Sequence, residues 1–427
     1  MIQYWLKNSK NILRSGYLWN MVAASVTAGQ SAVIMIFITR MLGTERAGIF
    51  GIAYAYALLL STFSKYGIRN YQVTDIKEKY TYGEYIVGRA ISISVALVAM
   101  SVYLTIQFYN GRYGLYKILI IAFICIWKQT DSIEDVIYGM YQQKGRFDIA
   151  SKCFFLRQFF STVIFCVLTL VHMDLLISCG LTAFTSVLCM LFLVGITRTT
   201  FQVNHVFTIK RSFQMLIDCI ALCISGTISN YVCNAPKYTV DRCMDDVSQA
   251  YFGYIMMPAY MIVMFSSFFF TPLLKDIGEM VYCGKKKALG HCFFRQSVII
   301  LFLTSVGILA AYVAGIPVLS AIYGIELDAF KKEMLLLVFG AGVYALLVFI
   351  TVLLTALRKQ NYIAGIYIIG IILFYFLGEY FAKKSGIFGV AITYLGVNMF
   401  MVVLLGLIFW VNFITLREKN DKLSCSN

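Results

Sequence analysis

The fold class is decided by long apolar stretches such as Ile387–Thr415, which has the sequence IFGVAITYLGVNMFMVVLLGLIFWVNFIT and contains no Asp, Glu, Lys or Arg. A helix needs about 20 mainly apolar residues to cross the hydrocarbon core of a membrane, and its backbone polar groups must be satisfied within the segment. About twelve such stretches fill most of the chain. The predicted spans are Tyr17–Ile38, Ala47–Phe63, Tyr85–Phe108, Tyr116–Ile137, Ile149–Val171, Leu175–Ile196, Phe213–Tyr238, Ala250–Phe270, Ser297–Ala314, Met334–Ala356, Ile363–Phe381 and Ile387–Thr415.

The composition agrees with an all-α integral membrane protein. The 427 residues are 60% hydrophobic and 13% charged, far from the balance of soluble proteins. The chain contains no Gly-rich phosphate loop, no HExxH and no GxSxG motif. We therefore expect neither an enzyme nor ATP-driven export by this chain itself. Met1–Ser15 is polar and basic, which predicts an amphipathic segment at the membrane surface and no cleaved signal peptide.

The distribution of Lys and Arg predicts the orientation in the membrane. If the N-terminus is cytoplasmic, most basic loop residues fall on the cytoplasmic side, as the positive-inside rule requires. Both chain ends are then cytoplasmic. The net charge of +15 is explained mainly by this topology and by attraction to anionic membrane lipid. Nucleic-acid binding is the poorer explanation, and we expect no nucleic-acid partner.

A short internal similarity links the two halves of the chain. Arg40–Gly51 (RMLGTERAGIFG) aligns with Arg242–Gly253 (RCMDDVSQAYFG), each starting with Arg and ending with Phe-Gly. Both stretches join an odd-numbered span to the next one. Parallel repeats with a binding site between them are a known transporter design. We therefore predict two six-helix lobes, residues 1–211 and 212–427, around a central cavity.

The span Tyr116–Ile137 is unusual because it contains the charged stretch WKQTDSIED at 127–135. Ionisable groups within a span are costly and are functional candidates. Lys128 lies about 18 Å along the helix, near the middle of the membrane. A simple alternative is a self-neutralising Lys128–Asp131 pair at spacing i, i+3; three acids against one base leave negative charge unbalanced. The residues predicted to share the buried face are Ile124, Lys128, Asp131, Asp135, Tyr138 and Gln142.

Further basic residues lie inside other predicted spans. Arg89 and Lys152 are each about one turn inside the cytoplasmic edge, where extension of the side chain to the interface is an equal explanation. Arg157 lies deeper and needs a partner or an anionic ligand, and Lys237 follows Pro236 near the other end of its span. Together these residues indicate a basic wall suited to phosphate.

Prolines, cysteines and histidines complete the set of candidates. Pro236 and Pro258 lie within or near the ends of two spans, where each removes a helix hydrogen bond; they are candidate hinges or static kinks. The twelve cysteines are scattered without a CxxC pair, and the three histidines are far apart in sequence. We therefore expect buried apolar cysteines, no metal and no cofactor.

Three motifs lie at the ends of spans. The first is FITRMLGTERAGIFG at 37–51, followed by LSTFSKYG at 60–67; the second is NAPKYTVD at 234–241, followed by AYFG at 250–253; the third is GIPVLSAIYG at 315–324. Together with the spans and loop lengths, they resemble the polysaccharide biosynthesis (Wzx-type) flippases. These are the O-antigen and capsule repeat-unit transporters of the multidrug/oligosaccharidyl-lipid/polysaccharide exporter superfamily.

The resemblance implies a V-shaped bundle in a bacterial inner membrane that moves undecaprenyl-diphosphate-linked oligosaccharide units from the inner to the outer leaflet by alternating access. It further implies a polysaccharide polymerase and glycosyltransferases as functional partners. Arg157, Lys237, Arg89 and Lys128 would hold the diphosphate. Asp131, Glu134 or Asp135 would exchange a proton or sodium ion, unless the membrane potential alone drives transport. Arg40 and Gly43 belong to a motif that shapes a turn.

Three alternatives remain open at this point. A structural or scramblase-like membrane protein would need no charged central face. A multidrug exporter of the same superfamily would prefer an acidic or aromatic pocket, and the buried excess of Arg and Lys argues against it. A membrane polysaccharide polymerase, which is an enzyme, would carry a long outer loop with functional Arg residues, and none of the predicted outer loops is long.

Overall fold

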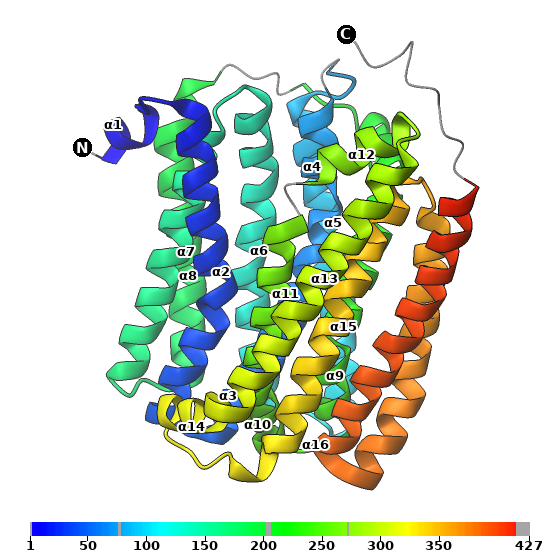
Figure 1. Ribbon diagram of the computed structural model, residues 1–427. Coiled ribbons are helices and arrows are strands. Elements are labelled where there is room, and N and C mark those ends of the chain that lie inside the picture. The colour runs from blue at the N-terminus through cyan, green and yellow to red at the C-terminus, as the bar shows by residue number, and fades with distance from the viewer. Residues whose placement is uncertain (1, 76–77, 202–205, 271–272, 416–427) are drawn as a thin grey trace. The chain divides into compact units, whose positions relative to one another are not determined.

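The computed structural model describes residues 2–75, 78–201, 206–270 and 273–415, and within these ranges every regular element is a helix. The chain divides into two compact units, Met1–Tyr231 and Val232–Asn427. Figure 1 shows the helices of each unit, most of them long and side by side. The all-α prediction is therefore confirmed. The predicted lobe boundary between residues 211 and 212 stays a prediction; the helix α9 (Ile209–Cys243) extends from one unit into the other.

The first unit contains the α-helices α1 to α8, a short 3-10 helix at Arg198–Thr200, and the beginning of α9. A helix satisfies its own backbone hydrogen bonds, so it can expose apolar side chains to lipid. The bounds are α1 Ile2–Lys7, α2 Ile12–Leu42, α3 Thr44–Lys65, α4 Ile68–Thr74, α5 Tyr82–Tyr109, α6 Leu115–Gln143, α7 Phe147–Leu170 and α8 Leu175–Thr197.

Helix α6 lies at the centre of the first unit. It packs against α3, α4, α5, α7 and α8, while α2 packs along α7. Because α6 is surrounded on several sides, its polar face does not need to meet lipid. This arrangement explains how a helix with a strongly charged C-terminal half is accommodated inside the bundle.

The junction of α2 and α3 is a single glycine. Gly43 has φ 95° and ψ 168°, ends α2 and begins α3, and this backbone region is essentially restricted to glycine. The predicted role of the Arg40–Gly51 motif in shaping a turn agrees with this geometry. The matching stretch in the second half also joins two helices, since α9 ends at Cys243 and α10 begins at Asp246.

The second unit is built from the end of α9 and the helices α10 to α16. Helix α15 lies against α11, α13 and α16. The long α16 has non-helical backbone at Ser385 and Gly386, between the two predicted last spans. The bounds are α10 Asp246–Ile255, α11 Met257–Phe270, α12 Leu274–Tyr282, α13 Lys286–Ala310, α14 Ile316–Tyr323, α15 Lys331–Ala356 and α16 Gln360–Ile414.

Nine helices of the described residues are long and apolar enough to cross a membrane, or up to ten if α10 and α11, bent by 42°, form one span. Helix α6 is outside that set because its Lys, Asp and Glu residues exceed what a typical span carries. Helix α16 includes two of the predicted spans. Each predicted stretch lies largely within helical structure, whereas the number twelve stays a prediction.

Candidate functional site

The candidate site is a set of buried charged side chains around α6. Lys128, Arg157 and Glu134 are completely buried, and Asp131 is 5% exposed. Burying an ionised group is costly unless it is paired and hydrogen-bonded. The site is therefore described by the ion-pair and hydrogen-bond partners of each buried charged side chain.

Arg157, on α7, is bound on all three of its nitrogen atoms. Its Nε donates to Glu134 Oε2 at 2.6 Å, one terminal nitrogen donates to Asp131, and the other donates to Thr130 and Ser186 at 3.0 Å each. A planar guanidinium is well suited to such a fixed set of acceptors. Arg157 thus joins α7 to α6 and α8 at one level of the bundle.

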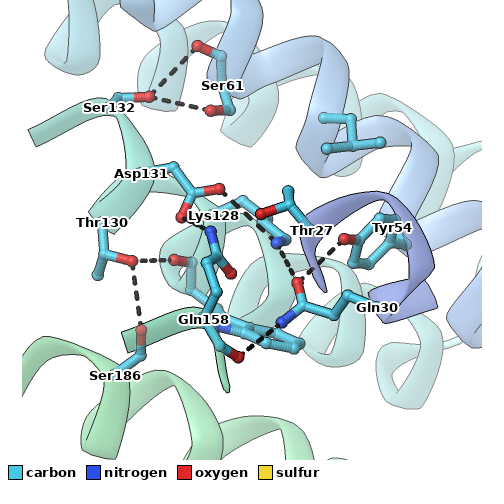
Figure 2. Close-up of polar contacts among 12 residues, drawn as sticks. Thr27, Gln30, Tyr54, Ser61, Lys128, Thr130, Asp131, Ser132, Gln158 and Ser186 are labelled. Carbon is cyan, nitrogen blue, oxygen red and sulfur yellow. Dashed lines mark hydrogen bonds and ion pairs between the residues drawn. The ribbon is translucent and has the colours of Figure 1, made fainter. Parts of the chain in front are cut away.

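Lys128 is held by groups from three helices. Its Nζ donates to Gln30 Oε1 at 2.5 Å and lies 3.7 Å from Asp131 Oδ2. The same Nζ lies 4.8 Å from the ring centroid of Tyr54, whose hydroxyl also donates to Gln30. Figure 2 shows Lys128, Gln30 and Tyr54 converging from α6, α2 and α3. The pair predicted from the i, i+3 spacing of Lys128 and Asp131 is thus present, as part of a larger network.

The network balances its own charges. Lys128 and Arg157 supply two positive charges, and Asp131 and Glu134 supply two negative charges, all joined by ion pairs. Gln158 adds a neutral donor to Asp131 Oδ1 at 3.0 Å. Helix α6 itself supplies only one base to this network, Lys128. The second base is Arg157, which comes from the neighbouring helix α7.

A second ionic cluster lies further along α6. Arg89, on α5, is 2% exposed and donates to Asp135 Oδ2 at 2.7 Å and to the Ser64 carbonyl oxygen at 2.5 Å. Arg69 approaches the other oxygen of Asp135 at 3.7 Å. Arg89 therefore does not extend to the interface as one sequence-based explanation allowed, because a carboxylate within the bundle binds it.

Lys152 is also held within the first unit. Its Nζ donates to the Trp5 carbonyl oxygen at 2.7 Å and to Ser9 Oγ at 2.9 Å. Leu6 is completely buried among residues of α6, α7 and α8. Lys152 thus anchors the N-terminal segment to α7, and α1 is packed on the bundle at this point.

Lys237 differs from the other candidate bases. It lies on α9 in the second unit, half-buried, with its Nζ 5.1 Å from the ring centroid of Tyr260. Among the described residues, no carboxylate forms an ion pair with it. A cation over an aromatic ring is attracted to it, but its charge is not neutralised by that contact.

The two candidate hinges lie in different settings. Pro236 is inside α9 and buried. Pro258 is the second residue of α11, next to the 42° bend between α10 and α11. Movement of either helix stays a prediction.

The structure brings six of the predicted site residues together in the first unit: Arg157, Lys128, Asp131 and Glu134 in one network, and Arg89 with Asp135 in the adjacent cluster. Sequence reasoning did not identify the other partners. Gln30 and Gln158 are strongly polar side chains inside predicted spans, and this polarity could have identified them as partners of the buried charges. The partners missed are Gln30, Tyr54, Thr130, Gln158, Ser186 and Arg69.

No group of three or more His, Cys, Asp or Glu side chains among the described residues is placed to hold a metal ion. The described cysteines of the predicted spans are all free: Cys125, Cys153, Cys166, Cys179, Cys219 and Cys223 are buried, and Cys189 and Cys233 are half-buried.

Comparison with known proteins gives a family match and several similar folds. A family model described as "Polysaccharide biosynthesis protein" matches residues 13–277. No curated protein matches the sequence. The fold is similar to an inward-facing multidrug resistance MATE family transporter of the MOP superfamily, with a TM-score of 0.69 and 11% identity over 94% of this chain and 99% of that one.

Two further solved structures share the fold. The lipid II flippase MurJ in an inward closed conformation has a TM-score of 0.65 and 14% identity over 94% of both chains. A mutant of the Vibrio cholerae MATE transporter VcmN has a TM-score of 0.63 and 11% identity over 95% of this chain and 96% of that one. At such low identity the likeness concerns the fold alone.

Proposed function

The chain belongs to the polysaccharide biosynthesis protein family, and from this premise we propose that it is a flippase for undecaprenyl-diphosphate-linked oligosaccharide repeat units. The proposed step moves each unit from the cytoplasmic to the outer leaflet of a bacterial inner membrane, for surface polysaccharide synthesis by alternating access. A polymerase and glycosyltransferases would act on the same lipid-linked glycan. The family resemblance predicted from the motifs is confirmed by the match; the cargo is our proposal.

The observation that best supports an anionic cargo is the setting of Lys237. Lys128, Arg157 and Arg89 each contact a carboxylate of the chain, whereas Lys237 has no such partner among the described residues. A half-buried ammonium without a counter-ion attracts a phosphate strongly, since screening by water is weak there. We therefore place one contact with the diphosphate at Lys237.

The three paired bases have a different proposed role. For Arg157 to contact a diphosphate, it must release Glu134 or Asp131, and for Arg89 the corresponding partner is Asp135. A cargo phosphate can replace a carboxylate as a partner of guanidinium because both offer the same paired oxygen acceptors. Binding of the cargo phosphate at Arg157 or Arg89 would thus release a carboxylate from its ion pair.

This exchange gives the acids their proposed part in coupling. Asp131, Glu134 and Asp135 are each compensated by a base in the conformation described. An acid released by its base becomes able to take up a proton or a sodium ion. The membrane potential is the alternative driving force, and it needs no titrating acid.

Genetic replacement of Lys237 tests the proposal. Lys237→Ala should abolish or strongly reduce surface polysaccharide and cause the lipid-linked unit to accumulate in the inner leaflet, while Lys237→Arg, which keeps the charge, should retain part of the export. The measurements are polysaccharide staining and extraction of lipid-linked intermediates from cells that produce equal amounts of membrane-inserted protein.

Lys331→Ala is the matched control. Lys331 also lies over an aromatic ring of the second unit, 4.1 Å from the centroid of Tyr312, so its loss removes a similar contact at another place. Normal export by Lys237→Ala would contradict the anionic-cargo model. If cells with Lys237→Ala instead lost resistance to cationic drugs, the multidrug-exporter alternative would be favoured.

A further inference from the structure

Four buried polar groups of α7 and α8 have no hydrogen-bond partner among the residues that the structure describes. They are Ser178 Oγ and Thr182 Oγ1 of α8, Ser161 Oγ of α7, and Gln158 Oε1 of the same helix. Ser178, Thr182 and Gln158 are completely buried, and Ser161 is 2% exposed. Buried polar groups are almost always satisfied, if not by the protein then by ordered water. We call these four groups the polar row.

The groups follow one another because of how α7 and α8 pair. The two helices are antiparallel and joined by the short turn after Leu170. Arg157 of α7 donates to Ser186 of α8. One turn further along α7 lies Ser161, and one turn earlier on α8 lies Thr182, so both hydroxyls are displaced from that contact in the same direction.

The polar row continues to the start of α8. Ser178 lies a further turn from Thr182, so Ser178, Thr182 and Ser186 occupy one face of α8 over about 12 Å. Helix α6 borders the same face, since Thr130 and Ser186 approach within 3.3 Å. At one end of the row stands the Arg157 network, and at the other stands Asp174, the N-cap of α8.

The chemistry of the polar row favours water over a metal ion. Hydroxyls and an amide oxygen can bind a series of water molecules, because they accept and donate hydrogen bonds in turn. A sodium ion favours uncompensated negative charge, and at the inner end of the row the carboxylates of Asp131 and Glu134 are already paired with Arg157. At the other end, the carboxylate of Asp174 is already paired with Arg46 at 3.3 Å. Figure 2 shows Ser186 and Thr130 on one side of Gln158, where the row meets the charged network.

We propose that a file of water molecules binds along the polar row of Ser178, Thr182, Ser161 and Gln158, and connects the buried Arg157 network to the end of the bundle at Asp174. This water would hydrate the guanidinium and its carboxylates and so lower the cost of exchanging their partners. The proposal concerns only the first unit and does not depend on the identity of the cargo.

The decisive variant is Thr182→Val, which replaces a hydroxyl by a methyl group of the same shape. If the hydroxyl binds water, its loss removes hydrogen bonds, and the unfolding midpoint should fall by about 2–4 °C. If the row is dry, the variant removes an unpaired buried hydroxyl, and the midpoint should stay equal or rise. The buried free cysteines allow unfolding of the purified protein to be followed with a thiol-reactive dye.

Thr185→Val is the matched control on the same helix. The hydroxyl of Thr185 donates to the Leu181 carbonyl oxygen at 2.8 Å, so it needs no water and its loss should change the midpoint little. An unchanged or raised midpoint for Thr182→Val would overturn the proposal. A lowered midpoint that matches that of Thr185→Val would do so as well, because the loss would not be specific to the polar row.

A double-mutant cycle tests whether the groups share water. Ser161→Ala and Thr182→Val act on the same level of the bundle, so together they should lower the midpoint by clearly less than the sum of the single effects. Additive losses would overturn the shared file. A rise in the wild-type midpoint with sodium but not with choline, absent in Thr182→Val, would replace water by a bound cation and would likewise overturn it.

Discussion

At the scale of single residues, the site is defined by charge balance. Arg157 and Lys128 face Asp131 and Glu134 inside the bundle, where none of the four is more than 5% exposed. The removal of one member of a buried set of charges leaves its partner uncompensated, which costs more than the loss of the contact itself. This property separates a structural role of Arg157 from a role in cargo binding.

Arg157→Gln should destabilise the protein by about 3–5 kcal/mol, because Glu134 and Asp131 then keep only one base between them. The double variant Arg157→Gln with Glu134→Gln restores the charge balance and should recover a large part of that loss. The measurement is the thermal unfolding midpoint of the wild type, both single variants and the double variant, compared as a double-mutant cycle. Additive destabilisation in the double variant would show that the two charges do not depend on each other.

The same double variant separates the two roles of Arg157. If its stability recovers but polysaccharide export does not, the guanidinium contacts the cargo or acts in coupling. If export recovers together with stability, Arg157 acts only by neutralising Glu134 in the fold, and its predicted role in holding the diphosphate is wrong.

Residue patterns predicted part of this site. The Lys128–Asp131 pair followed from the helix spacing alone, and it is found at 3.7 Å. The partners of Arg157 could not be predicted in this way. Packing between helices decides which residues of α6 lie opposite Arg157, and the periodicity of one helix does not contain that information. The sequence of α6 alone therefore showed an excess of acids. In the structure, Arg157 and Arg89 neutralise this excess from neighbouring helices.

At the scale of elements, helix ends decide where the chain can turn. The α2–α3 junction depends on Gly43 at φ 95° and ψ 168°, where any residue with a Cβ is strained. A Cβ at this position would meet no atom within 4 Å. The cost of a substitution would therefore come from the backbone alone.

Gly43→Ala should lower the stability by about 1–3 kcal/mol, measured by thermal unfolding. Gly29→Ala is the control, because Gly29 lies within α2 and a Cβ there would also meet nothing within 4 Å. With no unusual backbone angle, that change should be neutral or stabilise by about 0.5–1 kcal/mol. Equal effects of the two variants would show that the positive φ of Gly43 carries no strain for alanine.

At the scale of the whole molecule, hydropathy predicted the fold class, because the membrane constrains segment length and hydrogen bonding so strongly. It also located α6, although the charged residues of α6 exclude it from the helices that are apolar enough to cross a membrane by composition. It separated the last two spans at Ser385 and Gly386, where the helical backbone of α16 is interrupted. The cargo was not predictable in this way, since it depends on side chains that come together only in the folded protein.

The orientation of the molecule in the membrane is the remaining prediction at this scale. If both ends are cytoplasmic, as the positive-inside rule predicts, green fluorescent protein fused after the C-terminus should fluoresce. Alkaline phosphatase inserted at Gly111, between α5 and α6, should be active, and the same insertion at Gly284, between α12 and α13, should be inactive. The opposite pattern at all three sites would invert the topology. It would also place the end of α9 that carries Lys237 nearer the cytoplasm, so that the proposed contact with the diphosphate would belong to loading of the cargo and not to its release.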